Sequence, residues 1–177
     1  MSDFTGRMVR AARLEAGLYD EVKADRNATG QAIAVVALSS IAAGIGSFPR
    51  GGLAGIAVSI VSAIISWSIW SLLVFVIGAK VLPEPKTGSG YPAVLRTAGF
   101  AAAPGLIRVL GIVPGFTGLV FLVSTLWMIA AMIIAVRQAL DYENTWRAAA
   151  VSVLSWLIQA LLTGGLMYMA QGPAIPK

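Results

Sequence analysis

Four long stretches of this sequence carry no charged side chain: residues 27–49, 51–79, 109–136 and 148–176. A shorter stretch of the same kind covers residues 97–107. Crossing the hydrocarbon core of a bilayer, about 30 Å thick, takes about 20 apolar residues in a helix, and the four long stretches reach that length. The runs are continuously apolar and lack the alternation of membrane β-strands. They therefore predict transmembrane helices, in which the backbone polar groups bond internally.

The composition excludes most chemistry that a membrane enzyme uses. Of 177 residues, 58% are hydrophobic and 12% are charged, whereas soluble domains carry about 25% charged residues. The chain contains no histidine and no cysteine, and Glu84 is the one acidic residue between Asn27 and Leu140. Disulfides, zinc sites and intramembrane proton relays depend on those side chains. We therefore expect a non-enzymatic protein with no catalytic residues, no metal site and no cofactor.

The predicted fold class is an all-α integral membrane bundle of five transmembrane helices, preceded by a short amphipathic N-terminal helix. Segments rich in proline, glycine or charge separate the apolar runs. Residues 1–28 form the expected cytoplasmic segment, and residues 171–177 a tail. The transmembrane domain, residues 29–170, has spans expected at residues 31–48, 53–77, 92–111, 118–136 and 148–169.

The N-terminal amphipathic helix is expected over residues 3–19, followed by a charged connector over residues 20–26. At helical spacing Arg7, Arg10 and Arg13 share one side, where they would meet anionic lipid headgroups. A helix packed against the bundle is the alternative that the sequence leaves open. The opposite, apolar side consists of Phe4, Met8, Ala12 and Tyr19.

Lysines and arginines gather on one predicted side of the membrane, which sets the orientation. We expect the N-terminus in the cytoplasm and the C-terminus outside, in the plasma (inner) membrane. Residues 1–30 carry five basic and five acidic groups, so the formal charge of +5 comes from basic residues beside the spans. The expected partner is the lipid bilayer and not nucleic acid. Ten basic residues fall inside (Arg7, Arg10, Arg13, Lys23, Arg26, Lys80, Lys86, Arg96, Arg137, Arg147) and three outside (Arg50, Arg108, Lys177).

The third span is irregular. Gly99, Pro104 and Gly105 interrupt its middle, and Pro104 removes a backbone bond to the carbonyl of Phe100, which bends the helix. The bend either shapes the bundle or marks a functional site. Arg96 and Arg108 lie near the two ends of the span, so we expect their long side chains to snorkel to the headgroups. Binding of a lipid phosphate or a substrate is the alternative.

Small and hydroxylated residues recur at helical spacing in three spans. Such stripes let helices approach closely and hydrogen-bond across the contact. We expect them to pack helices together, because they lack an ionisable group; lining a polar pathway is the alternative. The stripes are Ala37, Ser40, Gly44 and Ser47; Gly52, Gly55, Ser59, Ser62 and Ser66; and Ser152, Ser155, Gln159 and Thr163.

Two charge pairs are expected between the fourth and fifth spans. Arg137 and Asp141 are four residues apart, as are Glu143 and Arg147, and each pair at this spacing contributes a few tenths of a kcal/mol. The four side chains would also form a charged knob on which a cytoplasmic partner could dock.

Three stretches together resemble the Yip1 family of small five-span membrane proteins, particularly its bacterial members. They are GLYDEVKADRNATGQA before the first span, AGFAAAPGLIRVLGIVPG through the third, and LWMIAAMIIAVRQALDYENTWRAA across the end of the fourth. The resemblance implies a five-helix bundle with a cytoplasmic N-terminus and no agreed catalytic residues. Its eukaryotic members act in vesicle traffic and associate with small GTPases. The positions matching its motifs are Tyr19, Gly99, Pro104, Arg108, Pro114, Arg137, Ala139, Leu140 and Asp141.

Two functions follow as hypotheses. The first is a non-enzymatic multi-pass protein that organises membrane lipid, or serves as a structural or accessory subunit with other membrane proteins or with itself. The second is a small transporter or channel for lipid or a neutral solute, with the third span as its broken helix. It requires a polar cavity that reaches Pro104 and is lined by the serines of the first, second and fifth spans. Candidate lipid or partner contacts are Arg7, Arg10, Arg13, Arg96, Pro104, Arg108, Arg137, Asp141 and Arg147.

Overall fold

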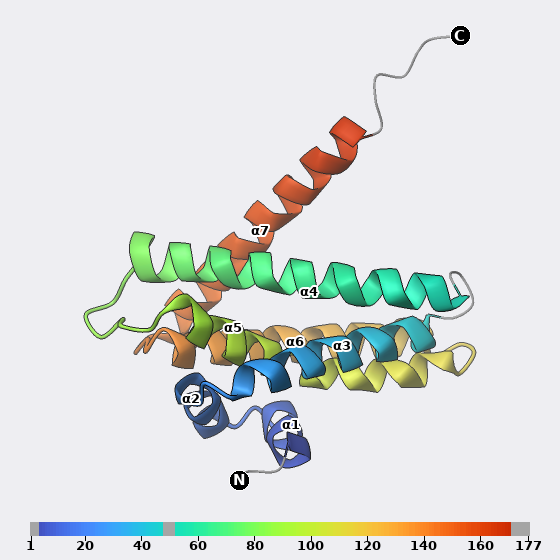
Figure 1. Cartoon of the computed structure of the whole chain (residues 1–177), viewed down its shortest axis with the longest axis horizontal. Helices are drawn as coiled ribbons and strands as arrows, with labels where there is room; N and C mark the ends of the chain where they lie inside the picture. Colours follow the sequence, from blue (N-terminus) through green and yellow to red (C-terminus); the bar gives the residue numbers. More distant parts are fainter. Residues whose placement is uncertain (1–3, 48–51, 171–177) are drawn as a thin grey trace.

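The computed structural model describes residues 4–47 and 52–170, and the regular structure in these ranges is helical. Two short helices, α1 (Phe4–Ala12) and α2 (Ala16–Ala24), precede the long segments (Figure 1). The long segments are α3 (Ala28–Gly46), α4 (Gly52–Val76), a third segment made of α5 (Tyr91–Phe100) and η2 (Ala103–Ile112), α6 (Thr117–Ala139) and α7 (Thr145–Ala170). A π-helical turn, η1 (Ile77–Val81), continues α4.

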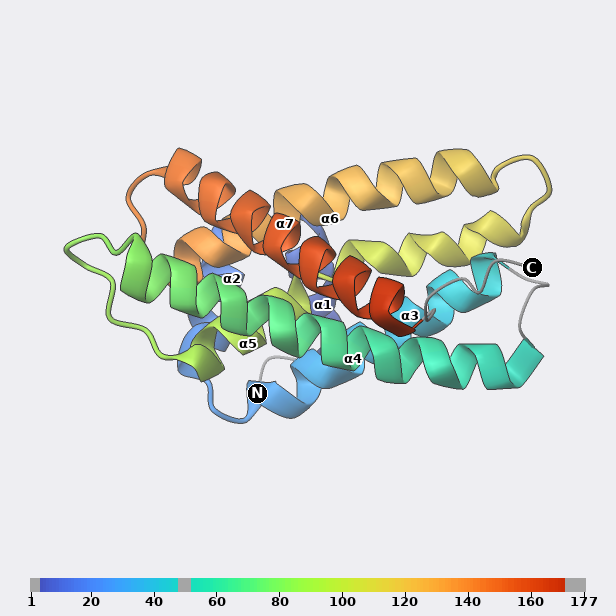
Figure 2. The same cartoon turned by 90° about the horizontal axis from the view of Figure 1, so that it is seen from above.

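The predicted fold class is confirmed. Among the described residues, five helical segments are long and apolar enough to cross a membrane. They run up and down past one another (Figures 1 and 2). We call the end of the bundle with α2 and the loops at residues 82–90 and 140–144 the near end. The far end carries the turn at residues 113–116. Predicted positions 48–51 and 171–177 lie outside the described residues.

The third segment is the centre of the bundle. In the most apolar stretch of this segment 67% of the residues are buried, against 17–33% in the corresponding stretches of the other four spans. α3 and α6 pack along η2, and glycines make the close approach possible. A Cβ atom on Gly46 would lie 1.8 Å from the carbonyl oxygen of Arg108, and one on Gly105 would lie 2.0 Å from Oγ of Ser39. Close backbone packing is thus concentrated between α3 and η2.

The interruption expected in the third segment is present. α5 ends at Phe100, and from Ala103 the backbone continues as a 3₁₀ helix. Pro104 has no amide hydrogen to donate, and the amide of Gly105 bonds the carbonyl of Ala102 at 2.9 Å, three residues back. The tighter winding of a 3₁₀ helix changes which side chains face each neighbour. It places Arg108 toward α6.

The N-terminal segment differs from the single helix predicted for it. α1 ends at Ala12, and Leu14 adopts a left-handed conformation with φ 62°. The amide of Glu15 then bonds the carbonyl of Arg10 at 3.1 Å, as at a helix end closed by a Schellman motif. α2 follows at once, so most of the predicted connector is helical. The apolar face of α2, which contains Leu18, Tyr19 and Val22, is fully buried.

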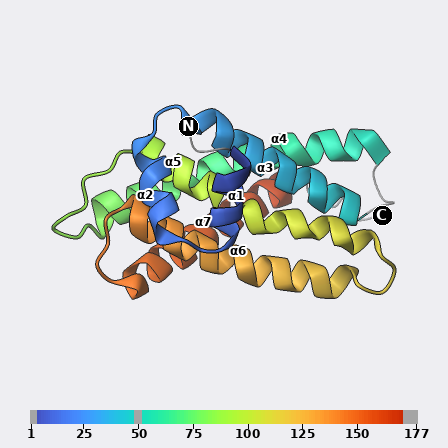
Figure 3. The same ribbon diagram turned by 90° about the horizontal axis from the view of Figure 1, so that it is seen from below.

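Both short helices pack against the bundle, which is the alternative that the sequence left open. Figure 3 shows α1 and α2 lying across the long helices. α1 contacts η2 and α5, and α2 contacts α5 and α6. The indole N–H of Trp127 on α6 donates to the carbonyl oxygen of Ala12 at 2.8 Å. The end of α1 therefore lies beside the middle of α6.

α7 is the least enclosed segment. It starts beside α4 and α6 at the near end and diverges from the bundle toward its C-terminal half (Figures 1 and 2). Residues 161–166 are all exposed. The divergence leaves space between α7 and the helices beneath it.

Candidate functional site

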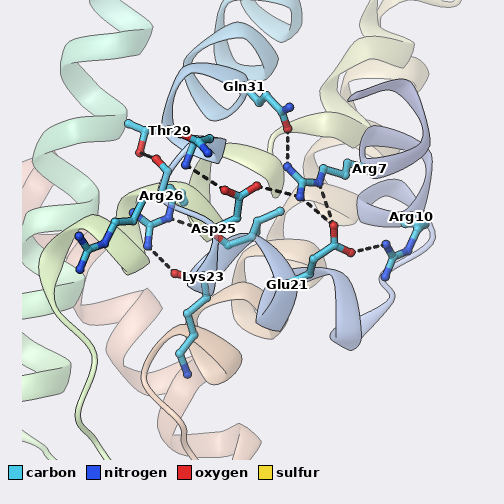
Figure 4. A network of polar contacts seen from close by, with 11 residues as sticks. Arg7, Arg10, Glu21, Lys23, Asp25, Arg26, Thr29 and Gln31 are labelled. Atoms are coloured by element: carbon cyan, nitrogen blue, oxygen red, sulfur yellow. Dashed lines mark hydrogen bonds and ion pairs between the residues drawn. The ribbon is translucent and has the colours of Figure 1, made fainter. Parts of the chain in front are cut away.

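The arginines of α1 bind carboxylates in α2 and directly after it, as Figure 4 shows. Arg7 is buried, and its guanidinium pairs with Glu21 and Asp25, each at 2.9 Å, and donates to Oε1 of Gln31 at 2.8 Å. The pairing lowers the pKa of the Asp25 carboxyl below its usual range, chiefly through the bond from Arg7. Burial by itself would lower the pKa of Arg7, but its bonds to the two carboxylates raise it. Arg7 therefore does not lie on a lipid-facing side.

The other two arginines of this segment are more accessible. Arg10 pairs with Glu15 at 3.0 Å and with Glu21 at 2.6 Å, and its side chain is about one third exposed, at 35%. Arg13 is exposed in the turn after α1. Contact of Arg10 and Arg13 with lipid headgroups stays a prediction.

Arg96 connects the third segment to α2. The side chain is buried, its Nε donates to the carbonyl of Val22 at 2.9 Å, and its Nη2 donates to the carbonyl of Lys23. Carbonyls in the last turn of a helix lack partners within that helix, and a cation there also meets the negative end of the helix dipole. The expected snorkelling of Arg96 is therefore wrong, because its guanidinium is used to cap α2.

Lys23 connects α2 to α6. Its ammonium bonds the carbonyl of Gln138 at 3.0 Å and pairs with the carboxylate of Asp141. Asp141 has φ 56° just after α6, a left-handed position that commonly ends a helix. A second contact with Asp141 comes from the hydroxyl of Ser89 at 3.3 Å. The Asp141 carboxylate thus joins α2, the 82–90 loop and the turn after α6.

The two charge pairs expected at four-residue spacing do not form. Asp141 pairs with Lys23, while Arg137 donates to the carbonyls of Tyr142 and Glu143, each at 3.3 Å. Glu143 pairs with Lys86 at 2.7 Å. The chain turns after Leu140, so side chains beyond it no longer follow the helical spacing of α6.

Glu84 joins the two loops of the near end. Its Oε2 accepts the amide of Glu143 at 2.8 Å, and its Oε1 lies 3.6 Å from Nε of Arg147. The hydroxyl of Tyr142 lies within hydrogen-bond distance of the carbonyls of Gly78 and Leu82. Glu84, the one acidic residue between Asn27 and Leu140, therefore holds the 82–90 loop against the chain after α6. The charged knob expected between the fourth and fifth spans is bonded to the 82–90 loop through Glu143 and Arg147, although Arg147 stays half exposed.

A cavity of about 720 Å³ lies between α3, α4, η2, α6 and α7, where α7 diverges. It is partly open to the surroundings of the bundle. Along α3 it extends from Val36 to Ser47, a rise of roughly 16 Å at about 1.5 Å per residue. That length is about half of a bilayer's hydrocarbon thickness of about 30 Å.

The lining changes character along the helices. Toward the far end it contains hydroxyl groups, and deeper in the bundle it contains indole and thioether side chains. Trp70 and Trp156 stack there, with ring centroids 5.8 Å apart. The cavity is therefore amphiphilic. Its far part includes Ser47, Ser59 and Thr163, and its deep part includes Trp67, Trp70, Met132 and Trp156.

Among the described residues that line this cavity, Arg108 is the one with a charged side chain. Its Nη2 donates to Oγ1 of Thr125 at 3.1 Å, and its Cζ lies 5.4 Å from the centroid of the Phe121 ring. Thr125 is eight residues into α6, about 12 Å below the far end of that helix. Thr125 is exposed on α6, so the guanidinium reaches across to that helix and away from its far end, and the expected snorkelling of Arg108 to the far headgroups is wrong.

Within the described part of the chain, four polar atoms of lining residues are buried without a hydrogen-bond partner. They are Nε of Arg108, Nε1 of Trp67, Nε1 of Trp70 and Oε1 of Gln159. Buried polar groups are normally bonded, and the exceptions call for a particular explanation. Three of the four are donors and one is an acceptor. The cavity wall therefore has more unpaired hydrogen-bond donors than unpaired acceptors.

Most described members of the small-residue stripes line this cavity, and for these the expectation that the stripes mainly pack helices is wrong in part, because Gln159 still donates to the carbonyl of Ser66 across the α4–α7 contact at 3.2 Å. Ser40, Gly44 and Ser47 of α3, Ser59 and Ser66 of α4, and Gln159 and Thr163 of α7 all line it. The serine hydroxyls on α3 donate to carbonyls of their own helix, as Ser40 does to Val36 at 2.9 Å. Ser152 and Ser155 are buried and bond within α7 instead. Side chains at positions 52 and 55 lie outside the described set.

The polar cavity required by the transporter hypothesis is present in part. Ala102 and Arg108, on either side of Pro104, line it, while Pro104 itself is fully buried behind the wall. The candidate residues named from the sequence do not include Thr125, Trp67 or Trp70. An arginine inside a span with no carboxylate nearby was the signal that pointed to this site.

The described residues contain no group of three or more acidic, histidine or cysteine side chains able to hold a metal. A family model, the Yip1 domain, matches residues 18–167. Searches of curated proteins and of solved structures find no match. The matched region contains the five spans, most of α2, and the cavity with Arg108. This multi-pass membrane protein belongs to the Yip1 family.

Proposed function

We propose that the protein is non-enzymatic and organises membrane lipid by holding one lipid molecule in the cavity between α3, α4, α6 and α7. The observation that carries this proposal is the amphiphilic lining, which has hydroxyl groups and Arg108 toward the far end and tryptophans deeper inside. Ligand cavities commonly have volumes of about 300–1,000 Å³, and this one, at about 720 Å³, is of that size. A partly open cleft beside α7 lets a guest enter from the bilayer.

The proposed orientation places the near end in the cytoplasm of a cell with an inner membrane. Most lysines and arginines lie at that end, including Lys80, Lys86 and Arg137, and basic residues favour the cytoplasmic side. The five spans then leave the C-terminus outside. In this orientation the polar part of the cavity belongs to the outer leaflet.

The test is lipid retention by a variant with a filled cavity. Ala160→Trp places a large ring at a small residue that lines the cavity on α7. Ala150→Trp is the matched control, because Ala150 is exposed on the same helix but does not line the cavity. Native mass spectrometry of the detergent-purified proteins should show one retained lipid in the wild type and in Ala150→Trp, and little in Ala160→Trp. Equal retention in both variants would contradict the proposal.

Lipid transport is a second candidate, favoured by one observation. Arg108 is located on the 3₁₀ segment η2, and irregular stretches within helices often mark hinges. Transport also needs a path past Val36 and Trp70, the deepest lining residues on α3 and α4. A fluorescent-lipid exchange assay in liposomes tests it: acceleration by the wild type and not by Ala160→Trp favours transport, and no acceleration leaves lipid holding alone.

The accessory-subunit form of the hypothesis stays a prediction. Its test is purification in mild detergent, which should recover a stoichiometric membrane-protein partner or an oligomer. A monomer without any partner would count against it.

A further inference from the structure

We infer that the guest is an anionic phospholipid whose phosphate is bound by Arg108 inside the cavity. This inference rests on the proposed lipid-holding function and specifies the chemical class of the lipid. It depends on the charge of Arg108, on the direction of its guanidinium and on the excess of donors in the wall.

The charge of Arg108 has no partner within the described bundle. Its guanidinium contacts the neutral hydroxyl of Thr125 and the ring of Phe121. Glu84, the one acidic residue between Asn27 and Leu140, is at the near end and bonds Glu143 and Arg147. Buried charges in proteins are normally paired, and an intramembrane cation marks a functional site whose partner has to be named. Here the pairing charge has to come from the guest.

The direction of the guanidinium separates Arg108 from an ordinary anchoring arginine. An anchor extends its side chain toward the headgroups at its own end of the span. Arg108 instead bonds Thr125, about 12 Å below the far end of α6. The anion that pairs with it is therefore drawn below the far surface, between the hydroxyls of the far part and the tryptophans of the deep part.

The unpaired donors point to an oxygen-rich guest. Arg108, Trp67 and Trp70 each carry a buried N–H without an acceptor, and these three residues line the same cavity. A phosphodiester and the ester carbonyls of a glycerolipid accept hydrogen bonds and donate none. A guanidinium is particularly suited to phosphate, which it can bind through two parallel bonds. The acyl chains would then lie against Trp156, Met128 and Met132.

The experiment compares two lipids that differ in headgroup charge. Wild-type protein in detergent is mixed with equal amounts of phosphatidylglycerol and phosphatidylcholine of identical acyl chains, and bound lipid is measured by native mass spectrometry. We expect the wild type to prefer phosphatidylglycerol. In Arg108→Gln the ratio of bound phosphatidylglycerol to bound phosphatidylcholine should fall about tenfold, which is the effect of one charge-assisted bond. Arg108→Lys should keep part of it, because the charge remains without the planar donor geometry. Lys80→Gln, which removes an exposed lysine at the near end, should match the wild type.

The outcomes separate this inference from the proposed function. If the wild type holds one lipid with no headgroup preference, or if Arg108→Gln keeps the preference, the inference is overturned while lipid holding stands. If neither lipid is held, the proposed function fails as well. Displacement of lipid by inorganic phosphate alone would assign the site to a soluble anion and overturn the lipid assignment. Should Arg108→Gln not fold, Thr125→Val replaces it, since it removes the hydroxyl that orients the guanidinium, and an unchanged preference in Thr125→Val would count against the inference.

Discussion

Nζ of Lys23 bonds the carbonyl of Gln138 and the carboxylate of Asp141, which is 118 residues further along the chain. One side chain of the N-terminal segment thus caps the end of α6 and neutralises the acidic residue in its left-handed position. This contact makes α2 part of the bundle and not a separate surface helix.

Removing the ammonium of Lys23 should loosen α2. Lys23→Ala is expected to lower stability in detergent by about 1 kcal/mol, since the pair is partly exposed. Thermal unfolding of the purified protein measures the change. Lys80→Ala, which removes an exposed lysine at the same end, is the control and should change little. A loss as large for Lys80→Ala would contradict the assigned contact.

Arg96 should prove a structural residue. Arg96→Met removes both bonds to the carbonyls of Val22 and Lys23 and leaves them buried, at a cost of about 2 kcal/mol. We expect faster cleavage within residues 4–24 by an added protease, with the long helices intact. Arg96→Lys should fall between this variant and the wild type, because a lysine cannot bond both carbonyls in the same planar geometry. Unchanged cleavage in Arg96→Met would rule out the capping role.

Two glycines of α3 should respond in opposite ways to alanine. A Cβ on Gly46 would lie 1.8 Å from the backbone oxygen of Arg108, whereas a Cβ on Gly30 meets nothing within 4 Å. Gly46→Ala is therefore expected to destabilise the bundle by at least about 2 kcal/mol. Gly30→Ala should stabilise it by up to about 1 kcal/mol through helix propensity. Unfolding curves in detergent measure the stability of both variants. An unchanged curve for Gly46→Ala would contradict the close approach of α3 to η2.

Acid should weaken the attachment of α1 to α2. The pKa of Asp25 is lowered in the folded protein, first by its bond from Arg7, so its ionised form stabilises the fold. That contribution is complete above the unfolded pKa of about 3.9 and is lost as pH falls through the lower folded pKa. The melting temperature of the wild type should therefore fall more steeply below about pH 4 than that of Asp25→Asn. Parallel pH profiles for the two proteins would contradict this.

The sequence predicted the five spans and the break in the third because these features depend on local composition. Apolar length determines whether a helix crosses a bilayer, and Pro104 removes a backbone bond wherever it is placed. The family was predicted as well, from motifs that include Tyr19, Asp141 and Pro104.

The contacts between segments were not predictable in the same way. The turn at Leu14 is stabilised by packing of α2, and no glycine or proline marks it. Helical spacing paired Arg137 with Asp141, but Lys23 lies closer once α2 has docked. The serines were interpreted as packing residues because the sequence does not show that α7 diverges from α4. Whether a stripe of small residues faces a neighbouring helix or a cavity depends on the angle between α4 and α7.

The central claim, that the cavity holds a lipid, is tested most directly by mapping a photoreactive phospholipid that stays bound after detergent has removed the bulk bilayer. α6 contains its own control, since Met128 and Met132 line the cavity while Leu122 and Leu126 are exposed on the outer surface. With a diazirine on the acyl chain, we predict adducts at Met128 and Met132 that disappear in Ala160→Trp. Adducts confined to Leu122 and Leu126, or unchanged in Ala160→Trp, would contradict the account.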